Sequence, residues 1–155
     1  MRDLPAVELL PGKSSHAAIR RAVEEIEAAD GLIVATPIYK ASYTGILKAP
    51  LDVLRQAGFA GKTVLPLATG GTLAHLLAVD YAPRPVLTAL GARHVAPGAF
   101  LLDSAFVDDP AAPRYTLAAG AELRLDTAVG QFADALAWHA PADPIPRNSA
   151  LAPAA

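Results

Sequence analysis

The sequence predicts an α/β fold in which a parallel sheet carries helices on both faces. Two observations indicate this class. Short apolar runs typical of buried strands alternate with stretches of helical periodicity, and turn residues separate the two kinds of segment. Three strands are expected, over 32–36, 63–68 and 94–102. The 155 residues suit one domain, because a chain of this size buries about two-thirds of its unfolded surface.

A helix is expected before the first strand. Small and aliphatic side chains share one face over 15–30, charged side chains fill the other, and Ser14 or Ser15 can cap the first turn. The run 32–36 is apolar up to Thr36 and too short for a helix. Such a run is typical of a strand buried on both faces.

A polar loop over 37–45 is expected to follow the first strand. Aliphatic positions between 46 and 54 then predict a second amphipathic helix. Pro50 lies inside this helix and is expected to kink or restrict it, since proline lacks a backbone donor.

The second strand leads into a third, irregular helix. Pro66 is awkward in a central strand, so it should lie near the strand's end or beside an unpaired neighbour. The helix that begins after Thr72 meets Pro83 and Pro85. It is therefore expected to break near Tyr81 and to resume toward Leu90.

The last third of the chain is expected to hold one strand and one helix. Pro97-Gly98 can interrupt the strand 94–102, and a loop rich in Asp, Pro and Ala follows over 103–120. The last helix carries an apolar stripe of Leu125, Val129, Phe132 and Leu136. A single domain over 1–140 and a disordered Pro/Ala-rich tail over 141–155 are predicted.

Composition argues against several classes of function. A net charge of −2 and a sequence without Lys/Arg clusters exclude the footprint of a nucleic-acid or membrane-surface protein. The absence of Cys removes disulfides, thiolate nucleophiles and Cys-ligated metals. No targeting or membrane-spanning segment is evident, so a cytoplasmic protein is expected. Charged residues make up only 18%, against about 25% on average, which favours subunit contacts and hence a homo-oligomer.

The loop after the first strand is the first candidate site. It places two tyrosines, hydroxyl residues and a lysine at a strand exit, between Thr36 and Gly45. Aromatic and aliphatic bodies there could stack on a flat ligand while hydroxyl and amide groups bond to its edge. The alternative is a solvated loop in which Thr44 merely caps the next helix.

The Gly-Gly loop after the second strand is the second candidate. Thr69, Gly70 and Gly71 bring backbone without Cβ atoms to the start of a helix, where free N–H groups could donate to a carbonyl or an anion. A plain turn is the alternative. Because both loops leave parallel strands at their carboxyl ends, a shared site at that edge of the sheet is predicted.

Other motifs carry less weight. Gly12-Lys13-Ser14 resembles the end of a phosphate-binding loop, but Val7 stands where the first Gly is required. His75 lies near the Gly-Gly loop, and backbone or water is its expected partner. The histidines lack metal-ligand spacing, so no metal site is predicted. The acidic loop that contains Asp103 is interpreted as solvated, and no Gly-x-Ser-x-Gly elbow is present.

Two segments resemble a known family. Residues 35–48 (ATPIYKASYTGILK) and 64–81 (VLPLATGGTLAHLLAVDY) closely resemble NADPH-dependent FMN reductases of the alkanesulfonate-assimilation type, and the likeness extends from about residue 2 to the last helix. The resemblance implies a flavodoxin-like α/β/α fold with FMN and NADPH as cofactors. It implies that hydride passes from NADPH to FMN and that the reduced flavin goes to a sulfonate monooxygenase that supports sulfur assimilation.

The resemblance also implies roles for individual residues. It assigns the cofactor-binding residues Thr36, Pro37, Ile38, Tyr39, Lys40, Ser42, Tyr43, Thr69, Gly70 and Gly71. Within this set, the stretch from Pro37 to Tyr43 would face the flavin ring and its ribityl chain, and the Gly-Gly loop would face the pyrimidine edge. No catalytic acid or nucleophile is named, because hydride transfer needs positioning rather than a general base. Tyr81 is expected at an oligomer interface, because its large ring lies at the predicted helix break.

The resemblance has a gap at the N-terminus. Family members begin with a strand and a Gly-Ser loop that binds the FMN phosphate, whereas residues 1–5 resemble the segment after the family's second strand. The expectation is a chain without the first two βα units, with an apolar edge along 32–36 that is liable to pair with another chain. A flavodoxin-like quinone or azo-dye reductase, and an inactive module that only binds flavin or associates with partners, stay open as alternatives.

Overall fold

The computed structural model describes residues 4–12, 15–108 and 115–139. The elements in chain order are α1 (Ala6–Leu9), α2 (Ala17–Ala28), β1 (Gly31–Tyr39), β2 (Ser42–Tyr43), α3 (Gly45–Asp52), β3 (Thr63–Gly70), η1 (Leu73–His75), α4 (Ala78–Tyr81), α5 (Pro83–Ala89), β4 (His94–Val95), β5 (Ala99–Leu102), η2 (Asp103–Ala105), β6 (Phe106–Asp108), β7 (Tyr115–Leu117) and α6 (Ala119–His139). The predicted tail, 141–155, lies outside the described residues, as does Ser14.

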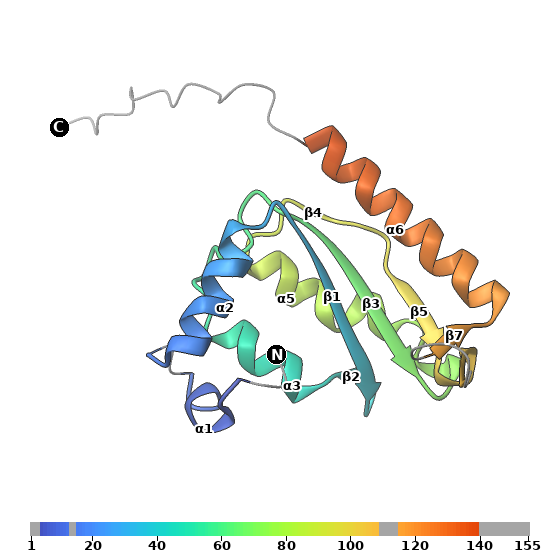
Figure 1. The fold of residues 1–155 in the computed structure, drawn as a ribbon, viewed down its shortest axis with the longest axis horizontal. Coiled ribbons are helices and arrows are strands. Elements are labelled where there is room, and N and C mark those ends of the chain that lie inside the picture. Colours follow the sequence, from blue (N-terminus) through green and yellow to red (C-terminus); the bar gives the residue numbers. More distant parts are fainter. Residues whose placement is uncertain (1–3, 13–14, 109–114, 140–155) are drawn as a thin grey trace.

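The main sheet confirms the predicted parallel α/β arrangement. Its strand order is β2-β1-β3-β4, and β5 also pairs with β3. β1, β4 and β5 run parallel to β3, and only the short β2 is antiparallel to its neighbour. The three predicted strands therefore exist, with the third one split into β4 and β5. The helices α2, α3 and α5 lie on one side of the sheet and α6 on the other (Figure 1).

Pro66 explains why the third strand is split. It is fully buried in the middle of β3 and pairs with Val34 on β1. On the other side of β3, Ala96 N donates to Val64 O at 2.9 Å. Because the polar groups of a strand alternate in direction, the side of Pro66 that lacks an N–H faces this same neighbour. The neighbouring chain leaves the ladder at this point, between β4 and β5. The expectation of an unpaired neighbour is confirmed.

Gly98 allows the neighbouring chain to pass close to Pro66. A Cβ atom built at this glycine would lie 2.8 Å from Pro66 O and 2.7 Å from Val79 Cγ2. Any larger residue would therefore push on both the backbone of β3 and the helix α4. The Pro97-Gly98 interruption predicted from the sequence is thus a packing requirement of the core.

The two faces of the sheet are covered unequally. On one face, Val34, Leu47, Phe59 and Leu87 form a core with residues of α2, α3 and α5. On the other face, Phe132 and Ala128 of α6 pack on Leu65, Ala96 and Ala99. The contacts of α6 with the sheet are concentrated on β3 and β5, and it meets β1 at Gly31, where a Cβ would lie 2.6 Å from Leu136.

This arrangement corrects the expectation that the first strand is buried on both faces. The side chains of β1 alternate between buried and exposed, with Val34, Thr36 and Ile38 buried, and Ile33, Ala35 and Pro37 exposed. The apolar run in the sequence indicates that the side chains on both faces of β1 are apolar. It does not indicate that α6 packs on β3 and β5 rather than on β1.

The helix α2 is stabilised by side chains at both ends, and its N-cap differs from the predicted one. His16 is the N-cap of α2, and its Nδ1 accepts from Ala18 N at 3.2 Å, so the expected serine cap is wrong. At the other end, the buried amine of Lys62 donates to Glu27 O at 2.7 Å and to Ala29 O. A cation bonded to the last carbonyls of a helix satisfies them and complements the helix dipole.

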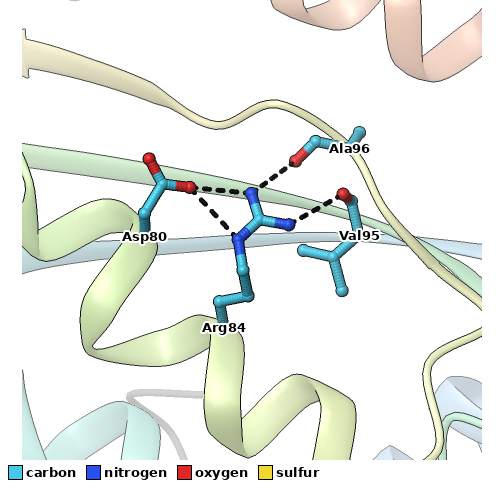
Figure 2. A network of polar contacts seen from close by, with 4 residues as sticks. All are labelled: Asp80, Arg84, Val95 and Ala96. Atoms are coloured by element: carbon cyan, nitrogen blue, oxygen red, sulfur yellow. Dashed lines mark hydrogen bonds and ion pairs between the residues drawn. The ribbon is translucent and has the colours of Figure 1, made fainter.

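The predicted break near Tyr81 is confirmed, although the segment before it is shorter than expected. A 3₁₀ turn, η1, and the single turn of α4 replace a continuous helix, and α5 starts at Pro83. Figure 2 shows how the break is held: Arg84 of α5 donates to Asp80 Oδ1 at 2.7 Å and to Val95 O at 3.0 Å. The arginine thereby joins α4 and α5 to the gap between β4 and β5.

Two further segments differ from the prediction. The expected loop over 103–120 contains η2 and a small antiparallel pair, β6 and β7. In α6 the stripe is only partly right, because Phe132 is buried and Leu136 half-buried, whereas Val129 is exposed and Ala128 is buried in its place. β6 and β7 are too short to give a periodic pattern in the sequence. Ala128 is a small residue, so the apolar stripe of the helix did not include it.

Candidate functional site

The two predicted loops meet at one edge of the sheet. The ends of β1 and β3 are in register, with Thr36 paired to Ala68 and Pro37 to Thr69. The end of β5 lies beside them, since Leu101 pairs with Thr69 and Leu102 with Gly70. In Figure 1 the arrowheads of β1, β3 and β5 point to the same end of the sheet. Carboxyl ends of parallel strands are where α/β proteins bind ligands.

The predicted polar loop over 37–45 contains a tight hairpin. β1 continues to Tyr39, and Ser42 and Tyr43 return antiparallel to it, with Tyr39 paired to Ser42. The two residues of the turn, Lys40 and Ala41, have positive φ angles of 52° and 62°. Asn-Gly and Asp-Gly are the usual signals of such a turn. Lys-Ala carries no such signal, so the sequence does not indicate the hairpin.

Replacing Ala41 by Gly should stabilise the protein. Positive φ costs a residue with a Cβ about 1 kcal/mol that glycine does not incur, so the free energy of unfolding should rise by about 1 kcal/mol. Urea denaturation followed by circular dichroism measures the change. Ala133→Gly, in the exposed interior of α6, is the control and should lower stability by a similar amount. Strain at the hairpin would be contradicted if Ala41→Gly did not raise the free energy of unfolding, or if Ala133→Gly raised it as well.

The base of the hairpin is held by two threonines. Thr36 is buried, and its Oγ1 accepts from Thr44 N at 3.2 Å and lies 3.4 Å from Thr44 Oγ1. Thr44 is the N-cap residue of α3, but its side chain makes no capping hydrogen bond. The simple capping interpretation of Thr44 is therefore wrong, and Thr36 serves to close the hairpin against β1.

The residues of the hairpin divide into an outer and an inner set. Tyr39 is 68% exposed, and the side chains of Pro37 and Lys40 are also exposed. Ile38 is only 4% exposed and packs against Phe100, and Tyr43 packs on the core beneath α3. Pro37, Tyr39 and Lys40 are thus available to a ligand through their side chains. Ile38 can contribute only its backbone.

The two glycines of the second loop have different surroundings. A Cβ at Gly70 would lie 3.0 Å from Phe100 Cζ and would enter the core. A Cβ at Gly71 would meet only Asp103 Oδ2, at 3.7 Å, which is an ordinary contact. The packing of this chain therefore requires glycine at position 70. At position 71 the packing does not require it, so the open space there is available to a ligand.

Asp103 borders the candidate site, although it is not among the predicted site residues. It follows β5 directly, and its exposed carboxylate faces the open space beside Gly71. The sequence signal is its position at the exit of a predicted strand, the same signal that marks the other two loops. Its exposure agrees with the interpretation of Asp103 as part of a solvated acidic loop.

The remaining charges near the site are exposed. Lys48, in the helix that follows the hairpin, pairs with Asp52 one turn later. The hydrogen bond to Asp52 raises the pKa of Lys48 above its usual 10.5, against a smaller desolvation effect. Because this pKa is raised, the ion pair of Lys48 and Asp52 contributes to stability at neutral pH. That contribution is lost only as the pH rises through the folded-state pKa of Lys48. Among the described residues, no group of three or more His, Asp and Glu could hold a metal ion.

The helices of the described ranges fall short of a membrane span. None of them combines the length and the hydropathy that crossing a bilayer requires.

Comparisons with known proteins agree with this architecture. The chain is 50% identical over 136 residues to an FMN reductase (NADPH) of Escherichia coli, which covers 88% of this chain and 70% of that protein. It is 49% identical over 104 residues to an FMN reductase (NADPH) of Pseudomonas putida, covering 67% of this chain and 53% of that protein.

A solved structure of an NADH:FMN oxidoreductase in its apo form matches with a TM-score of 0.68 at 45% identity, covering 88% of this chain and 66% of that chain. The flavodoxin-like fold expected from the sequence is thereby confirmed. The chain spans between about half and 70% of the lengths of these relatives. Residues 1–107 match NADPH-dependent FMN reductases as a family. The chain belongs to the NADPH-dependent FMN reductase family.

Proposed function

We propose that this chain transfers a hydride from NADPH to FMN and releases the reduced flavin. One observation carries the proposal. The hairpin formed by β1 and β2, which exposes Tyr39, and the Gly-Gly loop, which leaves open space at Gly71, lie at the same edge of the sheet. Family membership supports the same activity. NADPH is favoured over NADH because the Escherichia coli and Pseudomonas putida relatives at about 50% identity are named for it, although relatives at 34–36% identity and the solved relative are named for NADH.

The residues at this edge suit the ring system of a flavin. The exposed ring of Tyr39 and the pyrrolidine of Pro37 offer flat and apolar surface for stacking. The backbone from Thr69 to Gly71 can approach the edge of the ring because no Cβ intervenes at Gly71. Lys40 and Ser42, at the turn of the hairpin, supply polar groups for a ribityl chain.

The chemistry requires little of the protein beyond positioning. When bound, FMN accepts the hydride at its ring. Pro37 and Tyr39 would hold the ring, and the exposure of this edge would leave room for a nicotinamide beside it. The buried Thr36 and its bond to Thr44 keep the hairpin in place. No acid or base is assigned, since the transferred group leaves and arrives as a hydride.

The proposal extends to the fate of the product. Reduced flavin would pass to a flavin-dependent sulfonate monooxygenase and so serve sulfur assimilation, as the motifs at 35–48 and 64–81 imply. An exposed site supports this role, because the product must leave before it can be used elsewhere. Tyr39 is on the surface, as are Gly71 and Thr72.

A homo-oligomer is part of the proposal, with Tyr81 at its interface. Tyr81 is 77% exposed at the end of α4, which follows a segment with the exposed side chains of Leu73, Leu76 and Leu77. It also lines a hollow of about 580 Å³ with Asp80 and Arg84. An apolar patch of this kind is typical of a protein contact.

The function is tested by steady-state assays of the purified 155-residue chain. Loss of NADPH absorbance is followed with FMN, riboflavin or a benzoquinone as acceptor, and then with NADH in place of NADPH. FMN should be the preferred acceptor, and added FMN should behave as a released substrate. A preference for the quinone with tightly retained FMN would favour the quinone reductase. If the chain neither binds flavin nor oxidises NADPH, the remaining alternative is an inactive module that associates with partners.

A further inference from the structure

Asp103 lies at the same edge of the sheet as the Gly-Gly loop. It follows β5 directly, and β5 pairs with β3 so that Leu102 is beside Gly70. A Cβ atom built at Gly71 would lie 3.7 Å from Asp103 Oδ2, and beyond its chain neighbours it would meet no other described atom within 4 Å. The carboxylate is therefore the side-chain group that borders the open space at Gly71.

The described part of the chain places no cation against this carboxylate. Asp103 is exposed, and the ion pairs among the described residues involve other carboxylates. Arg124 of α6 donates instead to Phe100 O, at 3.3 Å. A ligand in the open space at Gly71 would therefore lie beside a carboxylate whose charge the described residues do not neutralise.

The proposed reaction changes the charge of the ring that would occupy this space. Hydride transfer converts NADPH to NADP⁺ and FMN to FMNH⁻, so the ring gains one hydrogen and two electrons. At neutral pH the added negative charge lies mainly in the pyrimidine part of the reduced ring. The family resemblance assigns the Gly-Gly loop to this part of the ring. Asp103 would thus lie beside a neutral ring before the transfer and an anionic ring after it.

We propose that Asp103 favours release of the reduced flavin by repelling its anionic ring. The inference rests on the proposed flavin reduction and adds to it a residue that discriminates between the two redox states of the flavin. Like charges a few ångström apart near a protein surface change an equilibrium by about five- to tenfold once solvent screening is included. The oxidised ring is neutral, so its binding is not weakened in this way.

Asp103→Asn tests the proposal in the full chain, because asparagine has the size of aspartate without its charge. Anaerobic calorimetry measures the dissociation constants of oxidised FMN and of FMN reduced with dithionite. The variant should bind reduced FMN about five- to tenfold more tightly than the parent does, and oxidised FMN equally well. The midpoint potential of the bound flavin should rise by about 20–30 mV, since tenfold corresponds to about 30 mV for two electrons.

Asp134→Asn is the matched control for the loss of one negative charge. Asp134 is exposed on α6 between Phe132 and Leu136, whose side chains meet Gly31 at the opposite end of the sheet. This variant should bind both forms of FMN as the parent does, and so should Asp103→Glu, which keeps the charge. Riboflavin separates the ring from the phosphate, and the effect of Asp103→Asn should persist with it.

The outcomes separate this inference from the proposed function. If the parent chain neither binds FMN nor oxidises NADPH, the proposed function fails and this inference fails with it. If the parent binds FMN but Asp103→Asn leaves the ratio of the two dissociation constants unchanged, only the role of Asp103 is overturned. An effect that appears with FMN and not with riboflavin would assign the repulsion to the phosphate, and it would also overturn the role proposed for Asp103.

Discussion

Replacing Gly71 by Val is expected to weaken FMN binding by about ten- to a hundredfold without unfolding the protein. The side chain would occupy space that the chain itself leaves open, since the nearest atom to a Cβ there is Asp103 Oδ2 at 3.7 Å. Crowding of a well-fitted contact costs about 1–3 kcal/mol, and each 1.4 kcal/mol is a factor of about ten in affinity. Flavin fluorescence quenching measures the dissociation constant, and urea denaturation measures stability.

Gly70→Val is the control, with the opposite expectation. Its Cβ would lie 3.0 Å from Phe100 Cζ in the core, so the free energy of unfolding should fall by about 1–3 kcal/mol. The adjacent glycines thus separate a binding defect from a folding defect. If Gly71→Val binds FMN as the parent does, the ring does not approach this loop and the site assignment fails.

Gly98→Ala is expected to cost about 2–3 kcal/mol of stability, although it adds one methyl group. The added carbon would lie 2.7 Å from Val79 Cγ2 and 2.8 Å from Pro66 O, and the second of these is backbone in the middle of β3. Pro66 O cannot move without disturbing the sheet, and the side chain of Val79 is itself buried. Equilibrium denaturation in urea gives the change in free energy.

Gly130→Ala provides the comparison for Gly98→Ala. It lies in α6 with no atom within 4 Å of a Cβ, and alanine is the better helix former by about 1 kcal/mol. This substitution should therefore stabilise the protein while Gly98→Ala destabilises it. A neutral Gly98→Ala would show that the gap between β4 and β5 is not set by close packing.

The order of strands and helices could be predicted because it depends on local patterns. Apolar runs mark the strands, and Pro83 and Pro85 mark the break between α4 and α5. These effects act within a few residues of the chain. Segments in which local preference is weak or overruled could not be predicted. The turn at Lys40 and Ala41 adopts positive φ without glycine, and the pair β6 and β7 is too short for a periodic signal.

The candidate site could be predicted as a set of residues but not as a surface. The register of β1 and β3 brings the two loops together, as expected for the carboxyl ends of parallel strands. Which side chains face outward depends on what covers each face. Ile38 turns inward against Phe100, while Tyr39, next to it in sequence, is exposed.

The sequence by itself determined the parallel α/β class, the loops that end its strands and the family to which the chain is related. Each of these follows from residue types at fixed spacing, which the chain carries in any conformation. Only the tertiary structure decided that Gly70 belongs to the core and Gly71 to the surface, and that Asp103 lies beside Gly71. Both depend on the pairing of β5 with β3, which brings Phe100 and Asp103 next to glycines that lie far from them in sequence.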